Sequence, residues 1–362
     1  MDAQPVVVST EEQSLPTGST ARTLGWEVAE RMELERPSWL ERLRPGRREA
    51  VAAAVGVAAF LVLFLVSCWL AGNPFAATQR APSAIVEVHG WTGTNHWAVL
   101  WWVVLIAAVL EFLDASAGMG YGTAITPLLL VIGFDPIQIV PAVMIQQGIA
   151  GLLGAYLHRE FGNVEWRLRP MSESIRLWLI IAGTGVIAVV FSVTAVYGLL
   201  KVAKVWISLY VAVLLVGMGV VSVVSWRRRS AYRPRRMAFF GALAAFNKGV
   251  GGGGYGPVVT VGGLMSGVPA KSMMAVTAIS EGTVCVASVV VWLAMLSQGV
   301  VIDFILLPSM LLGSMIAAVA APYATRVCPE RAWRLVVPIY CLLLAAYSFW
   351  KVIPAALGKL GF

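Results

Sequence analysis

Long apolar segments separated by short polar loops make up most of this chain. Runs of about 20 apolar residues are typical of helices that cross a bilayer, because such a helix is about 30 Å long. Two apolar regions, 97–132 and 237–265, are each interrupted by a cluster of glycines. The uninterrupted segments are 51–71, 137–157, 175–200, 205–226, 273–296, 304–323 and 333–353.

The two glycine clusters repeat one another. Gly118-Met119-Gly120-Tyr121-Gly122 matches Gly252-Gly253-Gly254-Tyr255-Gly256 at an offset of 134 residues. The same offset pairs Phe112 with Phe246, Asp114 with Lys248, Thr126 with Thr260, and Gly148 with Gly282. The chain therefore contains an internal duplication, and paired apolar segments interrupted by glycine point to the binding site of a transporter.

Composition indicates a polytopic membrane protein. Hydrophobic residues form 59% of the 362 residues and charged residues only 13%, and a soluble core cannot enclose so much apolar surface. The net charge of +8 comes from arginine clusters beside apolar segments, such as 227–236, which favours topology determinants over a nucleic-acid surface. The four cysteines lack a metal-binding spacing and are interpreted as buried free thiols.

The first 50 residues are polar and are predicted to form a soluble tail. Within the tail, residues 24–43 form either a helix on the membrane surface or a disordered segment. Arginines just before residue 51 place the tail in the cytoplasm by the positive-inside rule. We therefore predict a cytoplasmic tail (1–50), an additional transmembrane helix (51–71), a first transporter repeat (97–226) and a second, inverted repeat (237–354).

The two interrupted regions are predicted to turn back inside the membrane. From Arg236 to Gly251 a helix extends only about 20 Å, too little to cross a core of about 30 Å. Hairpins that enter and leave on one side also place three basic loops together in the cytoplasm. The predicted fold class is thus an all-α polytopic membrane protein with two inverted repeats. Each repeat is a re-entrant helix hairpin followed by three transmembrane helices, and the C-terminus lies outside the cytoplasm.

Glycines at the hairpin tips predict a polar cavity, because non-helical backbone at membrane depth must face protein or water. Short helices after the clusters, at 123–132 and 258–265, would aim their N–H groups at the tips, and two tips meeting near the midplane would bind an anion. The alternative is that the glycines only allow close helix packing. The predicted substrate-binding residues are Gly118, Gly120, Tyr121, Gln147, Asn247, Lys248, Gly251, Gly252, Gly253 and Tyr255.

Four ionisable residues inside the apolar segments are candidates for function, because charge is costly in a membrane. Lys248 is interpreted either as a donor to an oxyanion or as the ion-pair partner of Asp114. Asp114 and Glu281 are the predicted proton-coupling residues, with a structural carboxylate as the alternative for Glu281; Glu111 is assigned a structural role. The three histidines lie at or beyond segment ends, so we predict no metal site and no cofactor.

These motifs resemble the TauE/SafE sulfite exporter family. The resemblance rests on the paired G-x-G-x-G hairpins, on the turns at 133–136 and 267–269, and on residues 247–257, and it covers about residues 103–353. It implies a secondary transporter of the bacterial inner membrane that exports small sulfur-containing anions, such as sulfite or organosulfonates, with transport coupled to protons. The first copy departs from the commoner pattern at Met119 and at residues 123–126.

Two other functions compete with transport of an anion. The Gly-Tyr-Gly sequence also occurs in potassium-selective filters, but those use four copies around an axis, whereas this chain has two. An intramembrane enzyme would need a nucleophile and a base that face each other. Only Ser280 beside Glu281 suggests such a pair, and serine in a membrane helix commonly bonds to its own backbone. We therefore predict a transporter and not an enzyme.

Overall fold

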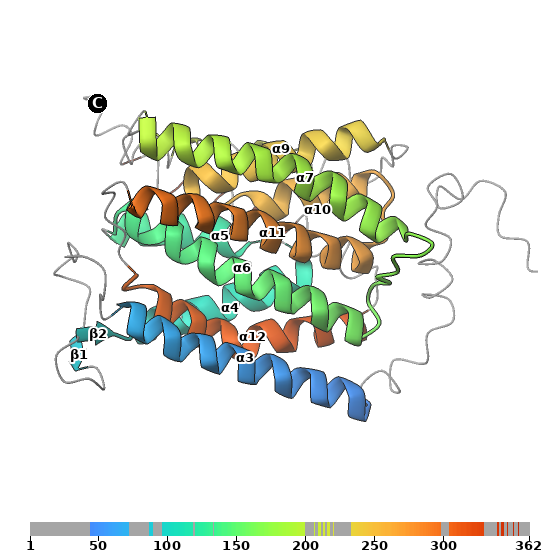
Figure 1. Ribbon diagram of the computed structural model, residues 1–362, viewed down its shortest axis with the longest axis horizontal. Helices are drawn as coiled ribbons and strands as arrows, with labels where there is room; N and C mark the ends of the chain where they lie inside the picture. The colour runs from blue at the N-terminus through green and yellow to red at the C-terminus, as the bar shows by residue number, and fades with distance from the viewer. Residues whose placement is uncertain are drawn as a thin grey trace, which may run out of the picture.

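The computed structural model is a bundle of long helices whose axes run in roughly one direction (Figure 1). It describes residues 44–71, 87–89, 96–118, 120–132, 134–199, 233–297 and 304–328, with isolated positions in 206–220 and 339–354. Residues 1–43 of the predicted tail and most of the segments 205–226 and 333–353 lie outside these residues, whereas residues 47–50 of that tail already belong to the first helix. The all-α fold is confirmed, and five of the described helices are long and apolar enough to cross a membrane.

The helices occur in the same order twice. After α3 (Arg47–Ala71) and a short unpredicted hairpin of β1 (Glu87–His89) and β2 (His96–Ala98), the chain forms α4 (Trp101–Ala117), α5 (Tyr121–Ile132), α6 (Pro136–Glu160) and α7 (Glu173–Val193), which continues as a π-helical turn, η2 (Thr194–Leu199). The second set is α9 (Pro234–Gly251), α10 (Tyr255–Met265), α11 (Ala270–Leu296) and α12 (Leu307–Val327). Helices α5, α6 and α7 begin 134 residues before α10, α11 and α12, which is the offset of the sequence duplication.

Both glycine clusters break the helix where the sequence predicts. Gly118 follows α4 with a φ of 73°, and Gly252 follows α9 with a φ of 72°. This left-handed conformation costs other residues about 1–2 kcal/mol, so glycine is favoured at both ends. The new helices begin at Tyr121 and Tyr255, slightly earlier than predicted, and both tyrosines therefore lie in a first helical turn.

Contacts between α4 and α12 show that these two helices are parallel. The Leu100 N–H, just before α4, donates to Ser309 Oγ at the start of α12 (2.9 Å). At the other end, Thr325 Oγ1 donates to the carbonyl of Ser116 (3.1 Å). Helix α4 therefore runs beside almost the whole length of α12.

Helix α6 runs in this same direction. Gln146 donates to Ser314 Oγ in the first part of α12, whereas Asn163, just after α6, donates to the carbonyl of Pro322. Since α4 and α6 both start at one end of the bundle, α5 must return between them. The chain thus doubles back at the first glycine cluster, and its turn inside a membrane stays a prediction.

The second half repeats this arrangement. Gly241 of α9 packs against Ile181 of α7, and Gly249 packs against Ser192 further along both helices. Helix α11 follows α7 in the same direction, because Trp178 donates to Thr283 and the Tyr197 ring lies against Trp292. Helix α10 therefore returns between α9 and α11.

The hairpins reach deeper than the sequence suggested. Helix α9 has 18 residues, because it begins at Pro234 and includes the arginines from which the prediction started counting; it is about 27 Å long. A Cβ on Gly118 would meet Thr260 in the middle of α10, and one on Gly252 would meet Thr126 in the middle of α5. The two tips thus pass each other instead of meeting end to end.

The two halves contact each other reciprocally. Helix α4 packs on α12 of the other half, α9 packs on α7, and the equivalent helices α6 and α11 pack on one another. Gly148 lies against Cys285 and Gly151 against Ala278 and Gly282, so α6 and α11 are antiparallel. Reciprocal contacts of this kind are those of a two-fold arrangement.

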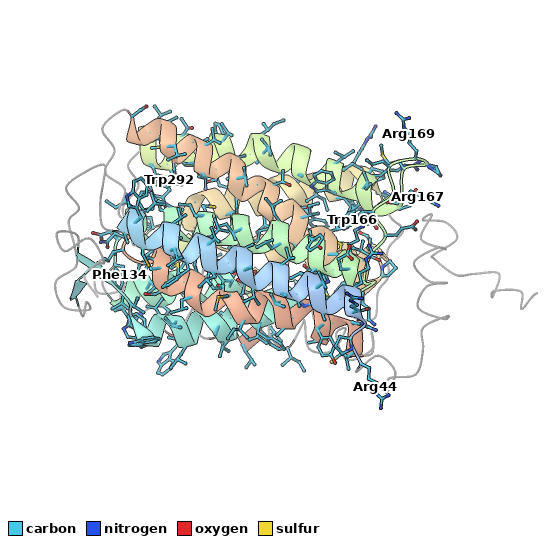
Figure 2. The ribbon with its side chains drawn as sticks, turned by 60° about the horizontal axis from the view of Figure 1, so that its bottom comes forward. Arg44, Phe134, Trp166, Arg167, Arg169 and Trp292 are labelled. Carbon is cyan, nitrogen blue, oxygen red and sulfur yellow. The ribbon has the colours of Figure 1, made fainter. Side chains whose placement is uncertain are left out.

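Arginines gather at one end of the bundle. Figure 2 shows Arg44, Arg167 and Arg169 at that end, and Phe134 and Trp292 at the opposite end. Helix α3 is tied here to both halves by two ion pairs. Nε of Arg48 lies 2.6 Å from Oε2 of Glu160 at the end of α6, and Glu49 pairs with Arg326 of α12. We call this the basic end of the molecule.

Candidate functional site

A buried ion pair lies next to the second hairpin tip. Lys248, in the last turn of α9, places Nζ 2.5 Å from Oε1 of Glu281 in α11. The two side chains are 1% and 7% exposed. A lysine and a carboxylate in such surroundings stabilise each other's charge, whereas either one alone would be strongly unfavourable. The sequence offered Asp114 as the partner of Lys248, but the direct contact is with Glu281.

The first half carries a related pair at the equivalent positions. Asp114 of α4 corresponds to Lys248, and Gln147 of α6 corresponds to Glu281. Asp114 interacts with the Gln147 side chain and with the backbone N–H of Tyr121. The duplicated scaffold therefore presents an ion pair in one half and a carboxylate–amide pair in the other.

Glu111 anchors a network of amides one turn before Asp114. Its Oε2 accepts hydrogen bonds from Gln146 (2.7 Å) and Gln147 (3.1 Å). Gln146 also donates to Ser314 of α12 (2.8 Å), which links the two halves. Gln147 thus joins the Glu111 and Asp114 carboxylates.

These groups surround a small pocket between α4, α6 and α11. Its polar lining comes from Glu111, Asp114, Gln147, Thr277 and Glu281, and small residues of α6 form another wall. The cavity volume is about 20 Å³, which is room for about one water molecule. An oxyanion with several heavy atoms requires the surrounding helices to move apart.

The hairpin tips contact each other directly beside this pocket. A Cβ on Gly122 would lie 2.1 Å from the carbonyl oxygen of Gly252, and one on Gly253 would lie 2.6 Å from that of Gly122. The Gly254 N–H donates to Thr123 Oγ1 across the tips (2.8 Å). Only glycine at these contacts allows the two backbones to approach so closely.

A threonine pair fixes the first tip. Thr260 Oγ1 donates to the carbonyl of Gly118 (2.6 Å) and lies 2.9 Å from Thr277 Oγ1. Gly118 and Thr277 both line the pocket. Helices α10 and α11 of the second half thus position the tip of the first half.

The predicted site residues divide into two groups. Four of them, Asp114, Gly118, Gln147 and Glu281, line the pocket. Lys248 joins it through Glu281, while the other predicted residues lie at the tips or further from it. Those other residues are Gly120, Tyr121, Asn247, Gly251, Gly252, Gly253 and Tyr255.

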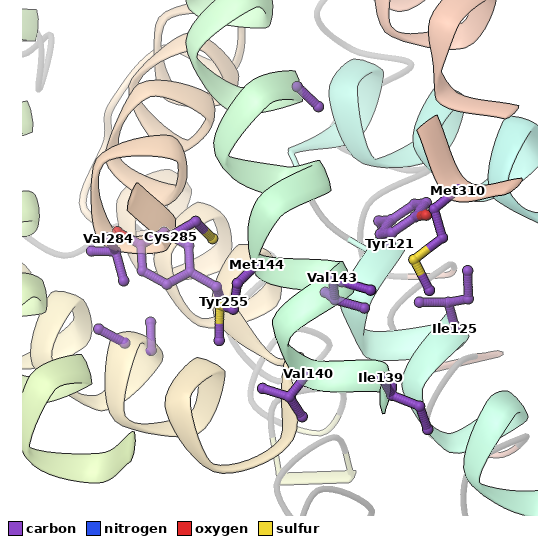
Figure 3. Close-up of a cluster of buried hydrophobic side chains, with 14 of the residues drawn as sticks. Tyr121, Ile125, Ile139, Val140, Val143, Met144, Tyr255, Val284, Cys285 and Met310 are labelled. Carbon is purple, nitrogen blue, oxygen red and sulfur yellow. The ribbon is translucent and has the colours of Figure 1, made fainter. Parts of the chain in front are cut away.

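The two tyrosines pack as apolar rings. Figure 3 shows Tyr121 beside Met310 and Tyr255 beside Cys285, on opposite sides of α6. Both hydroxyls are buried. Ser314 lies near the Tyr121 hydroxyl and Ser280 near that of Tyr255, although neither pair has good hydrogen-bond geometry. Nδ2 of Asn247 has no hydrogen-bond partner among the described residues. The side-chain oxygen of Asn247, Oδ1, accepts a hydrogen bond from the Tyr210 hydroxyl. Packing is therefore evident for the tyrosines, and hydrogen bonding to a substrate stays a prediction.

Sequence reasoning missed several polar residues near the site. Gln146 had a signal, since it stands beside Gln147 in an apolar run, and Thr260 had one in its repeat partner Thr126. Thr277 aligns with Val143 and gave no such signal. His158 lies in the last turn of α6, at the end of its segment as predicted, but it is fully buried, which the sequence did not indicate.

Glycine-broken hairpins that overlap beside buried charges, within a bundle of membrane-length helices, define the class of membrane transporters. The family model for "Sulfite exporter TauE/SafE" matches residues 103–348, so the chain belongs to this family. It is 27% identical over 162 residues to a protein of Bacillus subtilis (strain 168) described as "Probable membrane transporter protein YtnM". That alignment covers 43% of this chain and 51% of the relative, so the chain spans about half the relative's length. No solved structure matches. Family membership places the chain among transporters and not among enzymes.

Proposed function

We propose that the protein is a proton-coupled secondary transporter that exports small sulfur-containing oxyanions, such as sulfite or organosulfonates, from the bacterial cytoplasm across the inner membrane. The observation that carries this proposal is the overlap of two glycine-broken hairpins beside a buried cluster of ionisable residues. The family supplies the expectation of a sulfur-containing anion. The arrangement of the buried charges supports coupling to protons, and the two-fold arrangement of the halves supports alternating access.

Proton coupling is proposed because carboxylates outnumber cations around the pocket. Among the described residues, the carboxylates of Glu111, Asp114 and Glu281 share this region with the single ammonium group of Lys248. A bound oxyanion would add further negative charge in a medium that solvates charge poorly. Protons taken up by Asp114 or Glu281 as the anion binds would offset that charge, and their release would accompany release of the anion.

Donors for the anion come from the second half. Helix α10 begins at the tip without a side-chain cap, so its first N–H groups and its positive dipole end favour an anion there. Lys248 Nζ and Asn247 Nδ2 lie in the preceding turn of α9. In this proposal, Lys248 leaves Glu281 for the anion while Glu281 accepts a proton.

Alternating access follows from the two-fold arrangement. The equivalent helices α6 and α11 are antiparallel, so if both span the bilayer the two halves are inverted in it. Rocking of one half against the other would then open the pocket first to one side and then to the other. The basic end faces the cytoplasm in this proposal, in agreement with the positive-inside rule.

The test is transport by the purified protein in proteoliposomes. We expect an imposed pH gradient to drive movement of radiolabelled sulfite or a small sulfonate, and Lys248→Ala to reduce the flux by about tenfold or more. Lys271→Ala is the matched control, because Lys271 is equally buried but bonds the Arg326 carbonyl near the basic end. Unchanged flux in Lys248→Ala would remove this lysine from the site. Movement of other solutes but of no sulfur oxyanion would overturn the substrate class.

A further inference from the structure

His158 occupies a buried junction between three segments at the basic end. Its Nε2 lies 3.1 Å from the carbonyl oxygen of Ala115 in α4, and its Nδ1 lies 3.1 Å from Nδ2 of Asn163. Nδ2 of Asn163 also donates to the carbonyl of Pro322 in α12 (2.8 Å). The imidazole thus links α6 to α4 directly and to α12 through Asn163.

The partners define how the protons are arranged. The Ala115 and Pro322 carbonyls can only accept, so Nε2 of His158 carries a proton and the Asn163 amide must point its NH₂ group toward Pro322. Nδ1 of His158 therefore faces a donor with its lone pair, and the ring is neutral. The Asn163 Oδ1 is buried and has no hydrogen-bond partner among the described residues.

We propose that His158 is a proton-binding site that controls closure of the basic end of the transporter. A proton added to Nδ1 would set two N–H donors against each other. The Asn163 amide would then rotate so that its unpartnered Oδ1 accepts from Nδ1–H, and the Pro322 carbonyl would lose its donor. Binding of one proton therefore exchanges the link between the α6–α7 loop and α12 for a link to the imidazolium.

The junction is next to the transport pocket. Ala115 and Gly154, which lies one turn before His158 in α6, both line that pocket. Release of α12 from the loop would loosen the closure on the side of the pocket that faces the basic end. The inference rests on the proposed proton-coupled transport and adds to it a site through which protons act on access.

Few charges near the junction are free to compete with this switch. Arg48 pairs with Glu160, and Glu49 pairs with Arg326. On α11, Lys271 donates to the Arg326 carbonyl. On α4, Asp114 directly precedes Ala115 but lines the pocket, where it interacts with the Gln147 side chain.

The other half offers a natural comparison. Trp292 stands at the position equivalent to His158, is buried at the opposite end of the molecule, and packs on Tyr197 with ring centroids 4.8 Å apart. Tyr197 donates to the Val250 carbonyl, just as Thr325 donates to the equivalent carbonyl of Ser116. An indole does not titrate in this range, so the position equivalent to His158 carries no proton-sensitive side chain.

The experiment measures access to the pocket without any substrate. In full-length protein with its native cysteines replaced by serine, Ala150→Cys places one thiol in the pocket lining, and its rate of modification by a small methanethiosulfonate is measured in nanodiscs at about pH 6 and pH 8. Rates are divided by those of a cysteine on an exposed surface, which removes the pH dependence of the thiol itself. We expect the normalised rate to be about tenfold higher at the lower pH.

Variants separate the proton switch from a merely structural role. Gln at position 158 can still donate to Ala115 but cannot titrate, so His158→Gln should show a low rate at both pH values. Asn163→Leu removes the link to Pro322 and should show a high rate at both, while Trp292→Phe should respond as the parent does. A flat response in the parent, or the parental response in His158→Gln or Asn163→Leu, would overturn the proposal. Because no substrate is used, failure here is distinct from failure of the transport assay.

Discussion

The buried ionisable residues of this protein depend on their partners for stability. Repeat alignment placed Lys248 opposite Asp114, yet Lys248 contacts Glu281. The reason is geometric, because equivalent positions in a two-fold arrangement touch only when they lie close to the axis. Sequence could therefore identify the ionisable residues of the centre, since each is conspicuous in an apolar segment, but it could not identify their partners.

The Lys248–Glu281 pair leads to a prediction about stability. Glu281→Gln or Lys248→Met leaves one buried charge without its partner, so each should destabilise the protein by about 3–5 kcal/mol. The double variant removes both charges and should be close to the parent in stability, yet inactive in transport. A double-mutant cycle from chemical unfolding in detergent micelles measures this coupling; additive losses would contradict it.

Elements are the scale at which the sequence was most informative. The bounds of α6, α7, α11 and α12 follow the apolar runs, and both hairpins break at their glycines. The depth of the hairpins was missed, because arginines at the start of α9 were taken as the membrane boundary although they lie within the helix. The short β1–β2 hairpin had no alternating pattern long enough to predict it.

Contact between the hairpin tips yields a prediction at this scale. Gly122→Ala would place a methyl group 2.1 Å from the Gly252 carbonyl oxygen, and backbone on both sides must shift. We expect a loss of about 1–3 kcal/mol in unfolding free energy and a clear loss of transport. Gly183→Ala in α7 is the matched control, since its Cβ meets nothing within 4 Å, and helix propensity should leave stability unchanged or up to about 1 kcal/mol higher. Equal effects of the two substitutions would argue against close packing of the tips.

The whole molecule consists of two halves that pack on each other reciprocally and of one added helix, α3. Helices α4 and α9 each pack on the fourth helix of the opposite half, so each half holds part of the other's hairpin. Helix α3 adds ion pairs to Glu160 at the end of α6 and to Arg326 of α12, both at the basic end. Movements that open the basic end must therefore act on these ion pairs as well as on the His158 junction.

Orientation in the membrane is the prediction that belongs to the whole molecule. Arg235, at the exposed start of α9, lies at the basic end, and Ser297, after the end of α11, lies at the opposite end and is also exposed. If the basic end faces the cytoplasm, a membrane-impermeant maleimide added to intact cells should label Ser297→Cys but not Arg235→Cys, in protein whose native cysteines are replaced. In inside-out vesicles the reagent reaches the cytoplasmic face instead, so the pattern should reverse. The charge bias that orients the helices acts on both halves together. Labelling of both cysteines from one side would mean that the helices between them do not cross the bilayer as the inverted halves require, whereas a simple exchange of sides would keep the fold and reverse its orientation.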